Sequence, residues 1–285
     1  MRRHELTDRE RELLAPLIPR AATGRPRVSD RQVINGMVYK IRTGISWRDL
    51  PERYGPWKTV YTRFRCYALD GVFTDALQHL QAQADTVGYI DWLVQIDSTV
   101  VRAHQHAAAT GRKGAPLADE PDDHALGRSR GGLTTKIHLA CDSKGRPLAV
   151  LVTPGQRHDS ICALPLLERI RVPRTGPGRP RCRPDQVIAD KAYSSRGFRA
   201  YLRKRGIAHT IPEKTDQRRH RRNRGQRGGR PPSFDRDIYR QRNIVERCFN
   251  RLKGIRGIAT RYAKTAVSYE SAVTIAPFLL WARSV

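Results

Sequence analysis

The order of strand-like and helix-like segments after residue 89 is the feature that most restricts the fold of this 285-residue chain. Apolar runs rich in Val, Ile, Leu and Thr alternate with segments of helical period. Three strands come first, followed by helix, strand, helix and strand: WLVQIDSTVVRA, LTTKIHLACD, LAVLVTPG, SICALPLLERI, DQVIADKAY, SRGFRAYLRKRG and IAHTIP. Early strands without intervening helices pair antiparallel, whereas strands that alternate with helices pair parallel. The sequence therefore predicts an α/β fold in which helices cover a mixed sheet.

Residues 1–88 have a different pattern, with helical periods and no strand signal. Apolar residues recur at helical spacing through LTDRERELLAPLIP, RQVINGMVYKIRTG and two later segments. Short helices joined by Gly and Pro turns, with arginines between them, are typical of a helix-turn-helix type DNA-binding unit, and equally of any small helical bundle. We therefore expect a small all-α, helix-turn-helix-like domain over 1–88 and the mixed-sheet domain over 89–285.

Two segments do not fit this order and are expected to be loop insertions. Residues 104–132 are rich in Gly, Ala and charge. Residues 213–233 contain seven arginines and no aliphatic or aromatic side chain, so we expect them to be disordered on their own. The second segment is interpreted as an arm that neutralises DNA phosphates, the alternative being a solvated linker.

The charge balance points to a polyanionic partner. The chain has 54 basic and 27 acidic residues, which gives a net charge of +27. Such an excess of positive charge destabilises the compact state through mutual repulsion unless a polyanion offsets it. Nucleic acid is the first candidate for that partner. An anionic membrane surface is a weaker alternative, because the sequence has no basic amphipathic helix with a large apolar face. A basic soluble protein without a polyanionic partner is the remaining alternative.

The sequence indicates a reducing, aqueous compartment. The apolar run TIAPFLLWA is too short to span a bilayer, and the N-terminus has no apolar signal region. The five cysteines are scattered without paired spacing, which argues against a disulfide framework and against a zinc site. We expect a bacterial cytoplasmic protein associated with the nucleoid.

Two aspartates lie inside or at the end of predicted strands. Asp97 lies inside the first strand, where a lone buried carboxylate is costly. Asp190 ends the fourth strand. If these two strands are neighbours, the two acids can meet, and their repulsion is relieved by a cation between them. Oxygen ligands of this kind suit Mg²⁺ or Mn²⁺.

A glutamate stands alone in the basic segment YRQRNIVERCFNRLK. On a continuous helix, Tyr239, Arg242, Glu246 and Lys253 fall on one face, beside an apolar stripe that can pack on the sheet. Glu246 could then approach the two aspartates as a third carboxylate. The alternative is a surface ion pair with Arg242, four residues earlier, which is common and contributes little.

The same four residues spell Tyr-x2-Arg-x3-Glu-x6-Lys, which resembles the Y-R-E-K signature of bacterial insertion-sequence transposases with a DDE site. QIDSTVVRAH and VIADKAYSS, which hold the other two acids, are similar to that family's catalytic blocks, as are GRSRGGLTTKIH and PGQRHDS between them. GRPRVSDRQVINGMVYKIRTGISWRDLPERYGPWKTVYTRF is similar to the region that commonly precedes the catalytic domain. The resemblance spans nearly the whole chain.

This resemblance implies an RNase H-like catalytic domain and transposon-end DNA as the substrate. It implies that Asp97, Asp190 and Glu246 are catalytic and hold two Mg²⁺ ions, for which Mn²⁺ can substitute. The expected DNA-binding residues are basic or aromatic, namely Tyr239, Arg242, Lys253, Lys136, Arg128 and Arg130. The expected reactions are hydrolytic cutting at the terminal inverted repeats and transesterification of the 3′-OH ends into target DNA. Since two ends must be cut together, we expect a homodimer on DNA, with no membrane partner and no small-molecule substrate.

Other functions remain open at this point. A metal-dependent nuclease of the same fold would cut DNA without joining it. A DNA-binding derivative that has lost catalysis would keep the charge but not the activity. An RNA-binding protein would use the arginine segment but would leave the three acids unexplained.

Several further residues are singled out by their type. His104 and His106 could form a metal pair, but hard divalent ions prefer oxygen, and contact with DNA or no role is favoured. His158 and Asp159 are expected to border the site, with no role assigned. Trp47 and Trp57 are interpreted as core anchors of the N-terminal helices.

Overall fold

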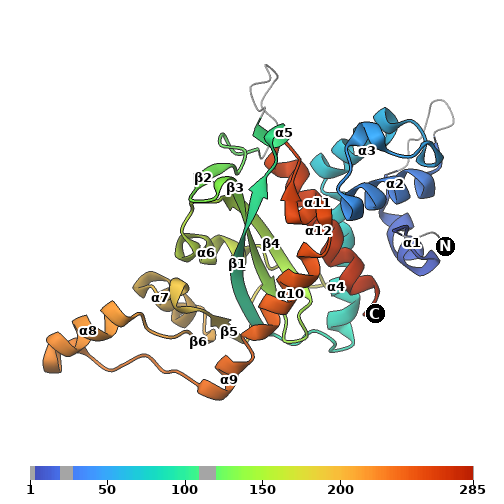
Figure 1. Cartoon of the computed structure of the whole chain (residues 1–285). Helices are drawn as coiled ribbons and strands as arrows, with labels where there is room; N and C mark the ends of the chain where they lie inside the picture. The colour runs from blue at the N-terminus through green and yellow to red at the C-terminus, as the bar shows by residue number, and fades with distance from the viewer. Residues whose placement is uncertain (1–3, 20–27, 109–119, 285) are drawn as a thin grey trace.

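The computed structural model describes residues 4–19, 28–108 and 120–284, and its centre is a mixed β-sheet (Figure 1). Within these residues the sheet has seven strands: β1 (Leu93–Ala103), β2 (Gly127–Ser129), β3 (Gly132–Cys141), β4 (Pro147–Pro154), β5 (Gln186–Ala189), β6 (Ala208–Thr210) and β7 (Thr260–Arg261). The five main strands lie in the order β4-β3-β1-β5-β6. β3 is antiparallel to β1 and β4, and β5 is parallel to β1 and β6. This is the RNase H-like arrangement, so the predicted fold class is confirmed.

Helices surround the sheet, and both the N-terminal and the C-terminal parts of the chain are mainly helical. They are α1 (Asp8–Leu14), α2 (Asp30–Thr43), α3 (Trp57–Leu69), α4 (Val72–Thr86), α5 (Gln105–Ala108), α6 (Asp159–Glu168), α7 (Arg196–Lys204), α8 (Thr215–Asn223), α9 (Arg236–Arg240), α10 (Asn243–Lys253), α11 (Arg256–Ala259) and α12 (Ala266–Ala282). Among the residues that the structure describes, 3₁₀ turns are interspersed: η1 (Ala15–Leu17), η2 (Trp47–Asp49), η3 (Glu52–Tyr54), η4 (Lys191–Tyr193) and η5 (Gly225–Gly228). The predicted order of three strands followed by helix, strand, helix and strand is confirmed by β1, β3, β4, α6, β5, α7 and β6, with α5 and β2 as additional elements.

Helices α6 and α10 cover opposite faces of the sheet. Side chains alternate between the two faces along a strand. Gln95 of β1 accepts a hydrogen bond from Val245 of α10, whereas Ser98 of the same strand donates one to Asp159 at the start of α6. Asp97 has the same parity as Gln95, so its side chain lies on the face that α10 covers.

The N-terminal helices are joined to the rest of the molecule by apolar packing. Thr7 caps α1 in a reciprocal capping box with Glu10, as its sequence favours. Gln81 of α4 and Trp281 of α12 both donate to the carbonyl of Pro147, at the start of β4. The buried apolar residues form one cluster that runs from Leu6 to Ala282. The predicted N-terminal helices are confirmed.

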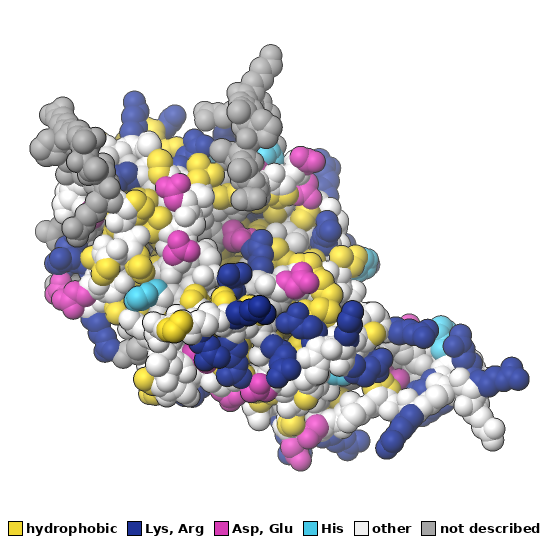
Figure 2. Space-filling view, turned by 180° about the vertical axis from the view of Figure 1, so that it is seen from behind, with side chains coloured by type: hydrophobic (Ala, Val, Ile, Leu, Met, Phe, Trp, Pro, Cys, Tyr) yellow, Lys and Arg dark blue, Asp and Glu magenta, His cyan; other side chains and the backbone are white. Residues whose placement is uncertain are grey.

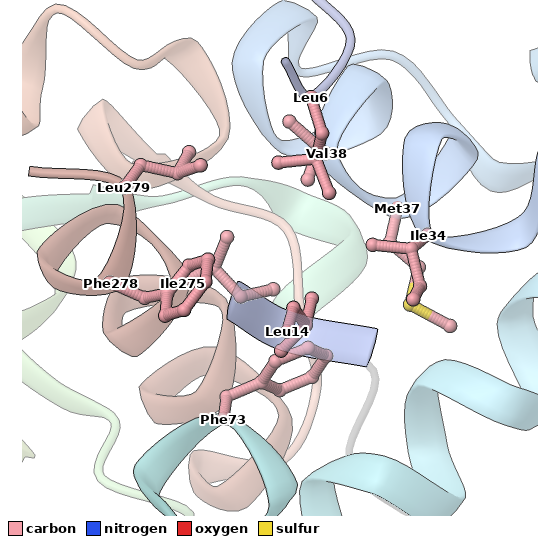
Figure 3. Close-up of a pocket in the computed structure, with 9 residues that line it drawn as sticks. All are labelled: Leu6, Leu14, Ile34, Met37, Val38, Phe73, Ile275, Phe278 and Leu279. Atoms are coloured by element: carbon pink, nitrogen blue, oxygen red, sulfur yellow. The ribbon is translucent and has the colours of Figure 1, made fainter. Parts of the chain in front are cut away.

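A small cavity remains between these helices (Figure 3). Its volume is about 10 Å³, close to that of one water molecule, and its lining is wholly apolar: Leu6, Leu14, Ile34, Met37, Val38, Phe73, Ile275, Phe278 and Leu279. A cavity of this size and polarity is a packing gap and not a substrate site. Trp47 and Trp57 are half-buried against the same core, as predicted.

The arginine-rich segment 213–233 differs from the sequence-based expectation. It forms helix α8 and the turn η5 instead of a disordered loop, and it projects from the body of the molecule (Figure 1). Arg and Gln are good helix formers. The helix is further fixed at its start, because Gln217 bonds to the backbone of Lys214 and Ser194, and Arg221 pairs with Glu213.

The segment 104–132 also contains regular structure where a long loop was expected. It holds α5 and strand β2, which pairs with β3. Glu120 accepts hydrogen bonds from the first N–H groups of α12, and the buried Arg261 donates to the carbonyls of His124 and Ala125. The middle of the expected loop, 109–119, lies outside the described residues.

The predicted continuous helix from Tyr239 to Lys253 is interrupted. Helix α9 ends at Arg240, a tight turn follows, and α10 begins at Asn243. The N–H of Ile244 bonds to Gln241 three residues back, and the N–H of Val245 bonds to the Gln95 side chain. Because a tertiary partner takes this N–H group, the break could not be read from helical periodicity.

Candidate active site

Parallel pairing brings the two aspartates to the same place on the sheet. Ile96 of β1 is paired with Ala189 of β5, and Asp97 and Asp190 are the next residues on each strand. The pairing of β1 with β5 ends there, because Asp190 turns away and caps η4 by accepting the N–H of Ala192 at 2.8 Å. The structure therefore meets the condition under which the sequence allowed the two acids to meet, because the first and fourth predicted strands are neighbours.

Helix α10 brings the third acid. Its buried stripe, Val245, Cys248, Phe249 and Leu252, packs inward and leaves Glu246 nearly half exposed. The bond from Val245 N to Gln95 Oε1, at 3.1 Å, fixes the start of the helix to β1 two residues before Asp97. Glu246 follows Val245 directly, so this anchor sets its distance from the sheet.

Arg242 links two of the three acids. Its Nη1 lies 3.3 Å from Asp97 Oδ2, and its Nη2 pairs with Glu246 Oε1. The sequence left two readings for Glu246, a third carboxylate of the site or an ion-pair partner of Arg242. In the structure Glu246 makes that ion pair, and the same guanidinium connects it to Asp97.

The pKa of Asp97 responds to both of the other acids. Burial raises the pKa of Asp97 to about 6, and the carboxylates of Asp190 and Glu246 add to the rise. The Ser98 N–H and the Arg242 guanidinium oppose it. Burial also raises the pKa of Tyr239, with further upward contributions from the three carboxylates. Tyr239 of α9 is therefore within electrostatic reach of the three acids despite the break in the helix.

The donor set fits a hard divalent cation. Three carboxylates offer only oxygen ligands, which is the chemistry that Mg²⁺ and Mn²⁺ prefer. Burial first, and the two neighbouring carboxylates second, disfavour the charged form of Asp97 and raise its pKa, and a bound cation would favour that charged form. In the described part of the chain no three His, Cys, Asp or Glu side chains are already gathered closely enough to hold an ion. The guanidinium of Arg242 supplies the positive charge between Asp97 and Glu246 in this arrangement.

The other predicted DNA-binding residues are spread around this centre. Lys253, at the end of α10, donates to the Val100 carbonyl at 3.4 Å. Lys136 of β3 is largely buried and pairs with Asp159 at 3.0 Å. Arg128 and Arg130 are exposed on the hairpin formed by β2 and β3. Lys253 therefore lies beside β1 near the acids, whereas the hairpin pair lies apart from them.

A second polar group lies under the site on the α6 face. Ser98 donates to Asp159 Oδ1 at 2.6 Å, and Lys136 donates to the same oxygen. Tyr193, at the end of η4, is fully buried nearby. The PGQRHDS motif was the signal for Asp159, whereas Ser98 and Tyr193 lie inside the blocks QIDSTVVRAH and VIADKAYSS without having been singled out.

The two histidines singled out earlier lie beside each other but not at the acids. The rings of His104 and His106 are 4.5 Å apart, and His104 also packs on Tyr262 at 5.0 Å. They belong to no metal-binding cluster within the residues that the structure describes. His158 is exposed at the start of α6.

Basic side chains continue outward from the body of the protein. Figure 2 shows Lys and Arg gathered in the middle of one face and along the projecting segment that contains α8. The helix is exposed along almost its whole length. None of the helices that the structure describes is long and apolar enough to cross a membrane.

Comparison with known proteins identifies the family. Residues 89–279 match the family described as "Transposase DDE domain", and residues 6–77 match "Putative transposase of IS4/5 family". The chain is 31% identical over 151 residues to a putative transposase for insertion sequence element IS6501 of Brucella ovis, a match that covers 53% of this chain and all of that protein. It is 38% identical over 87 residues to a putative transposase for insertion sequence element IS402 of Burkholderia cepacia, covering 30% of this chain and 40% of that protein.

Among solved structures, a Mos1 transposase paired-end complex matches 84% of this chain and 82% of its own, with 12% identity and a TM-score of 0.23. A similarity at that level does not inform the activity of this chain. The DDE-domain match, in contrast, spans more than half of the sequence and includes Asp97, Asp190 and Glu246. The chain therefore belongs to the DDE transposases of bacterial insertion sequences and is a DNA transposase.

Proposed function

We propose that this transposase binds the terminal inverted repeats of its own insertion sequence, cuts at their ends by metal-dependent hydrolysis, and joins the 3′-OH ends to target DNA by transesterification. The observation that carries this proposal is that β1 and β5 end side by side at Asp97 and Asp190, while Arg242 joins Asp97 to Glu246 of α10. No external energy source is needed, because one phosphodiester replaces another.

Asp97, Asp190 and Glu246 are proposed to hold two Mg²⁺ ions, with Mn²⁺ as a substitute. Such ions supply activation of the attacking oxygen and neutralisation of the leaving 3′ oxygen. The chain's own residues position the DNA. Arg242, already aimed into the site, would grip a phosphate with its fork of donors, and Lys253 would act as a point charge. Tyr239 would border the scissile strand.

Binding of the DNA outside the site is assigned to three basic regions. The N-terminal helices are proposed to form the helix-turn-helix-like unit that reads the repeat. The exposed helix α8 and the hairpin carrying Arg128 and Arg130 would neutralise backbone phosphates. The same substrate would place the protein at the nucleoid of the bacterial cytoplasm.

We propose that the enzyme acts as a homodimer, because two transposon ends must be cut together. Mixing wild-type protein with a Glu246→Gln variant should reduce activity below the fraction of active protomers. Activity proportional to the wild-type fraction would argue against obligatory pairing.

An assay of both chemical steps tests the proposal. Purified full-length protein is incubated with labelled DNA that carries the element's inverted repeats and with a supercoiled target plasmid, in Mg²⁺ or EDTA. Cutting at the repeat end followed by transfer of the label to the plasmid is the expected result. Release of cut ends without joining would favour a metal-dependent nuclease. Binding without cutting in either Mg²⁺ or Mn²⁺ would favour a catalytically silent derivative.

A further inference from the structure

Gln95 is a polar side chain in the apolar centre of β1. It is 0% exposed, and its neighbours on the strand, Val94 and Ile96, are also fully buried. Its Oε1 accepts the N–H of Val245 at 3.1 Å, whereas its Nε2 has no hydrogen-bond partner among the described residues. An unpaired buried amide group destabilises the fold, and a methionine of similar length would avoid that cost. Core packing alone therefore does not explain a glutamine at this position.

The bond from Val245 to Gln95 replaces a bond of the helix. In a continuous α-helix the Val245 N–H would bond to the carbonyl of Gln241, four residues earlier. That carbonyl instead accepts the N–H of Ile244, three residues later, at 3.0 Å. The N–H of Arg242 likewise bonds three residues back, to Tyr239, at 3.0 Å. The chain is therefore tightly turned before α10, and Gln95 supplies the acceptor that the turn takes away from Val245.

The same bond holds α10 beside the acids. Side chains two residues apart on a strand lie on one face, so Gln95 and Asp97 both point towards α10. Two polar contacts join the start of α10 to β1 among the described residues, namely Val245 with Gln95 and Arg242 with Asp97. Glu246 follows Val245 directly. Its distance from Asp97 therefore depends on these two contacts and on the apolar packing of the helix.

We propose that Gln95 is a positioning residue of the active site, whose side-chain carbonyl keeps the start of α10, and with it Glu246, beside Asp97 when Arg242 leaves Asp97 for a DNA phosphate. This role rests on the proposed functions of Glu246 and Arg242. The Arg242 side chain is 25% exposed, and its pair with Asp97 is given up in that step. The Gln95 bond is buried, uncharged and independent of DNA. Displacement of a catalytic group by about 1 Å can lower a rate about 10²-fold, so the remaining contact matters for the rate.

Single-turnover cleavage of repeat DNA in Mg²⁺ tests the role, with wild type, Gln95→Met and Gln81→Met compared at saturating DNA. Gln81 is the matched control. It is a buried glutamine with one unpaired amide atom, and it ties another helix, α4, to the carbonyls of Pro147 and Leu148. We expect Gln95→Met to lower the cleavage rate constant on the order of 10²-fold, with the affinity for the repeat changed only a few-fold. Gln81→Met should cleave at the wild-type rate.

Two results of this comparison would overturn the proposal. One is a wild-type cleavage rate in Gln95→Met. The other is an equal loss of rate in both glutamine variants, which would mean that either substitution simply weakens the fold. Thermal unfolding of each variant in EDTA, measured in parallel, shows how much of the protein is folded at the assay temperature.

Hydrogen exchange at single-amide resolution supplies a measurement on the unaltered protein, in EDTA and without DNA. The amide of Val245 lies in the first turn of α10, where N–H groups have no partner within the helix. Because Gln95 accepts this N–H in the buried core, we expect it to exchange slowly, as the amides of Phe249 and Leu252 do later in the helix. Exchange of the Val245 amide at the rate of an unstructured peptide would overturn the proposal.

A Glu246→Gln variant in the same assay separates this role from the proposed function. If Glu246→Gln abolishes cleavage and Gln95→Met cleaves as wild type does, only the role of Gln95 is wrong. If Glu246→Gln also cleaves at the wild-type rate, Glu246 is not part of the active site, and both the proposed site and the role of Gln95 are wrong.

Discussion

Arg242 and Asp97 form an ion pair across the joint between α10 and β1, with 3.3 Å between Nη1 and Oδ2. The same guanidinium pairs with Glu246, one helical turn along α10. A single cation therefore ties the helix that carries one acid to the strand that carries another. Only a quarter of the Arg242 side chain is exposed, so contacts within the protein hold its guanidinium in place.

Replacing Arg242 should impair catalysis more than binding. Loss of a charged donor aimed at a transferring phosphoryl group lowers rates on the order of 10²-fold. We expect Arg242→Ala to reduce single-turnover cleavage to about that extent, with DNA affinity changed only a few-fold. Arg242→Lys should recover part of the rate, because it restores the positive charge but not the paired N–H donors of the guanidinium. Arg240→Ala is the control, since Arg240 is exposed and pairs only with Asp237 among the described acids. Wild-type cleavage by Arg242→Ala would contradict this role.

Helix α8 should supply sequence-independent affinity for DNA. Arg218, Arg219 and Arg222 are exposed on it, and each phosphate contact contributes about 0.9 to the slope of log K against log salt concentration. Changing all three to Gln should weaken binding and lower that slope by about 2–3. In the matched control, three exposed arginines elsewhere on the surface are changed to Gln, namely Arg171, Arg174 and Arg179. Equal losses in both triple variants, measured by fluorescence anisotropy, would show that only net charge matters.

Lys40 should make stability depend on pH. It is buried beneath the rings of Trp47 and Tyr262, and burial lowers its pKa from 10.5 to about 8. The unfolded state therefore binds more protons between pH 8 and 10.5, so the contribution of Lys40 to stability rises with pH across that window and is lost as pH falls through 8. At pH 7 Lys40→Met should be more stable than wild type by about 1–3 kcal/mol, less any lost cation–π attraction.

Urea unfolding at pH 7 and at pH 10.5 measures this difference. The advantage of Lys40→Met should shrink at the higher pH, because the wild-type lysine is neutral there in the folded protein. A Lys40→Met variant less stable than wild type at pH 7 would mean that the buried ammonium is a net stabilising group.

The sequence indicated the sheet and its acids because both depend on local patterns. Apolar runs of strand length, separated by turn residues, mark β1, β3 and β4, and an acid inside QIDSTVV is out of place in any core. Asp190 at the end of its strand and Glu246 in a basic helix stand out in the same way. The sequence left open whether the first and fourth strands are neighbours, and the parallel pairing of β1 with β5, which brings Asp97 and Asp190 together, is seen only in the structure.

The remaining features depend on contacts that the sequence does not display. The break between α9 and α10 arises where Gln95, about 150 residues away, takes the N–H of Val245. The lack of apolar residues in helix α8 predicted disorder. The helix propensity of its residues is nevertheless high, and Gln217 anchors the helix by a hydrogen bond to the backbone carbonyl of Ser194. The group of Ser98, Asp159 and Tyr193 joins three elements, and tertiary proximity of this kind leaves no spacing pattern in the chain.

Asp97, Asp190 and Glu246 are proposed to form one metal-dependent active site. Cleavage of DNA carrying the element's inverted repeats is the direct measurement, with wild type compared with Asp97→Asn, Asp190→Asn and Glu246→Gln in Mg²⁺ and in Mn²⁺, and with binding measured in parallel. We expect metal-dependent cutting by wild type and a loss on the order of 10³-fold in every variant, each still binding the repeat. Wild-type cutting by any one of the three variants would remove that residue from the site and show that the three acids do not act together.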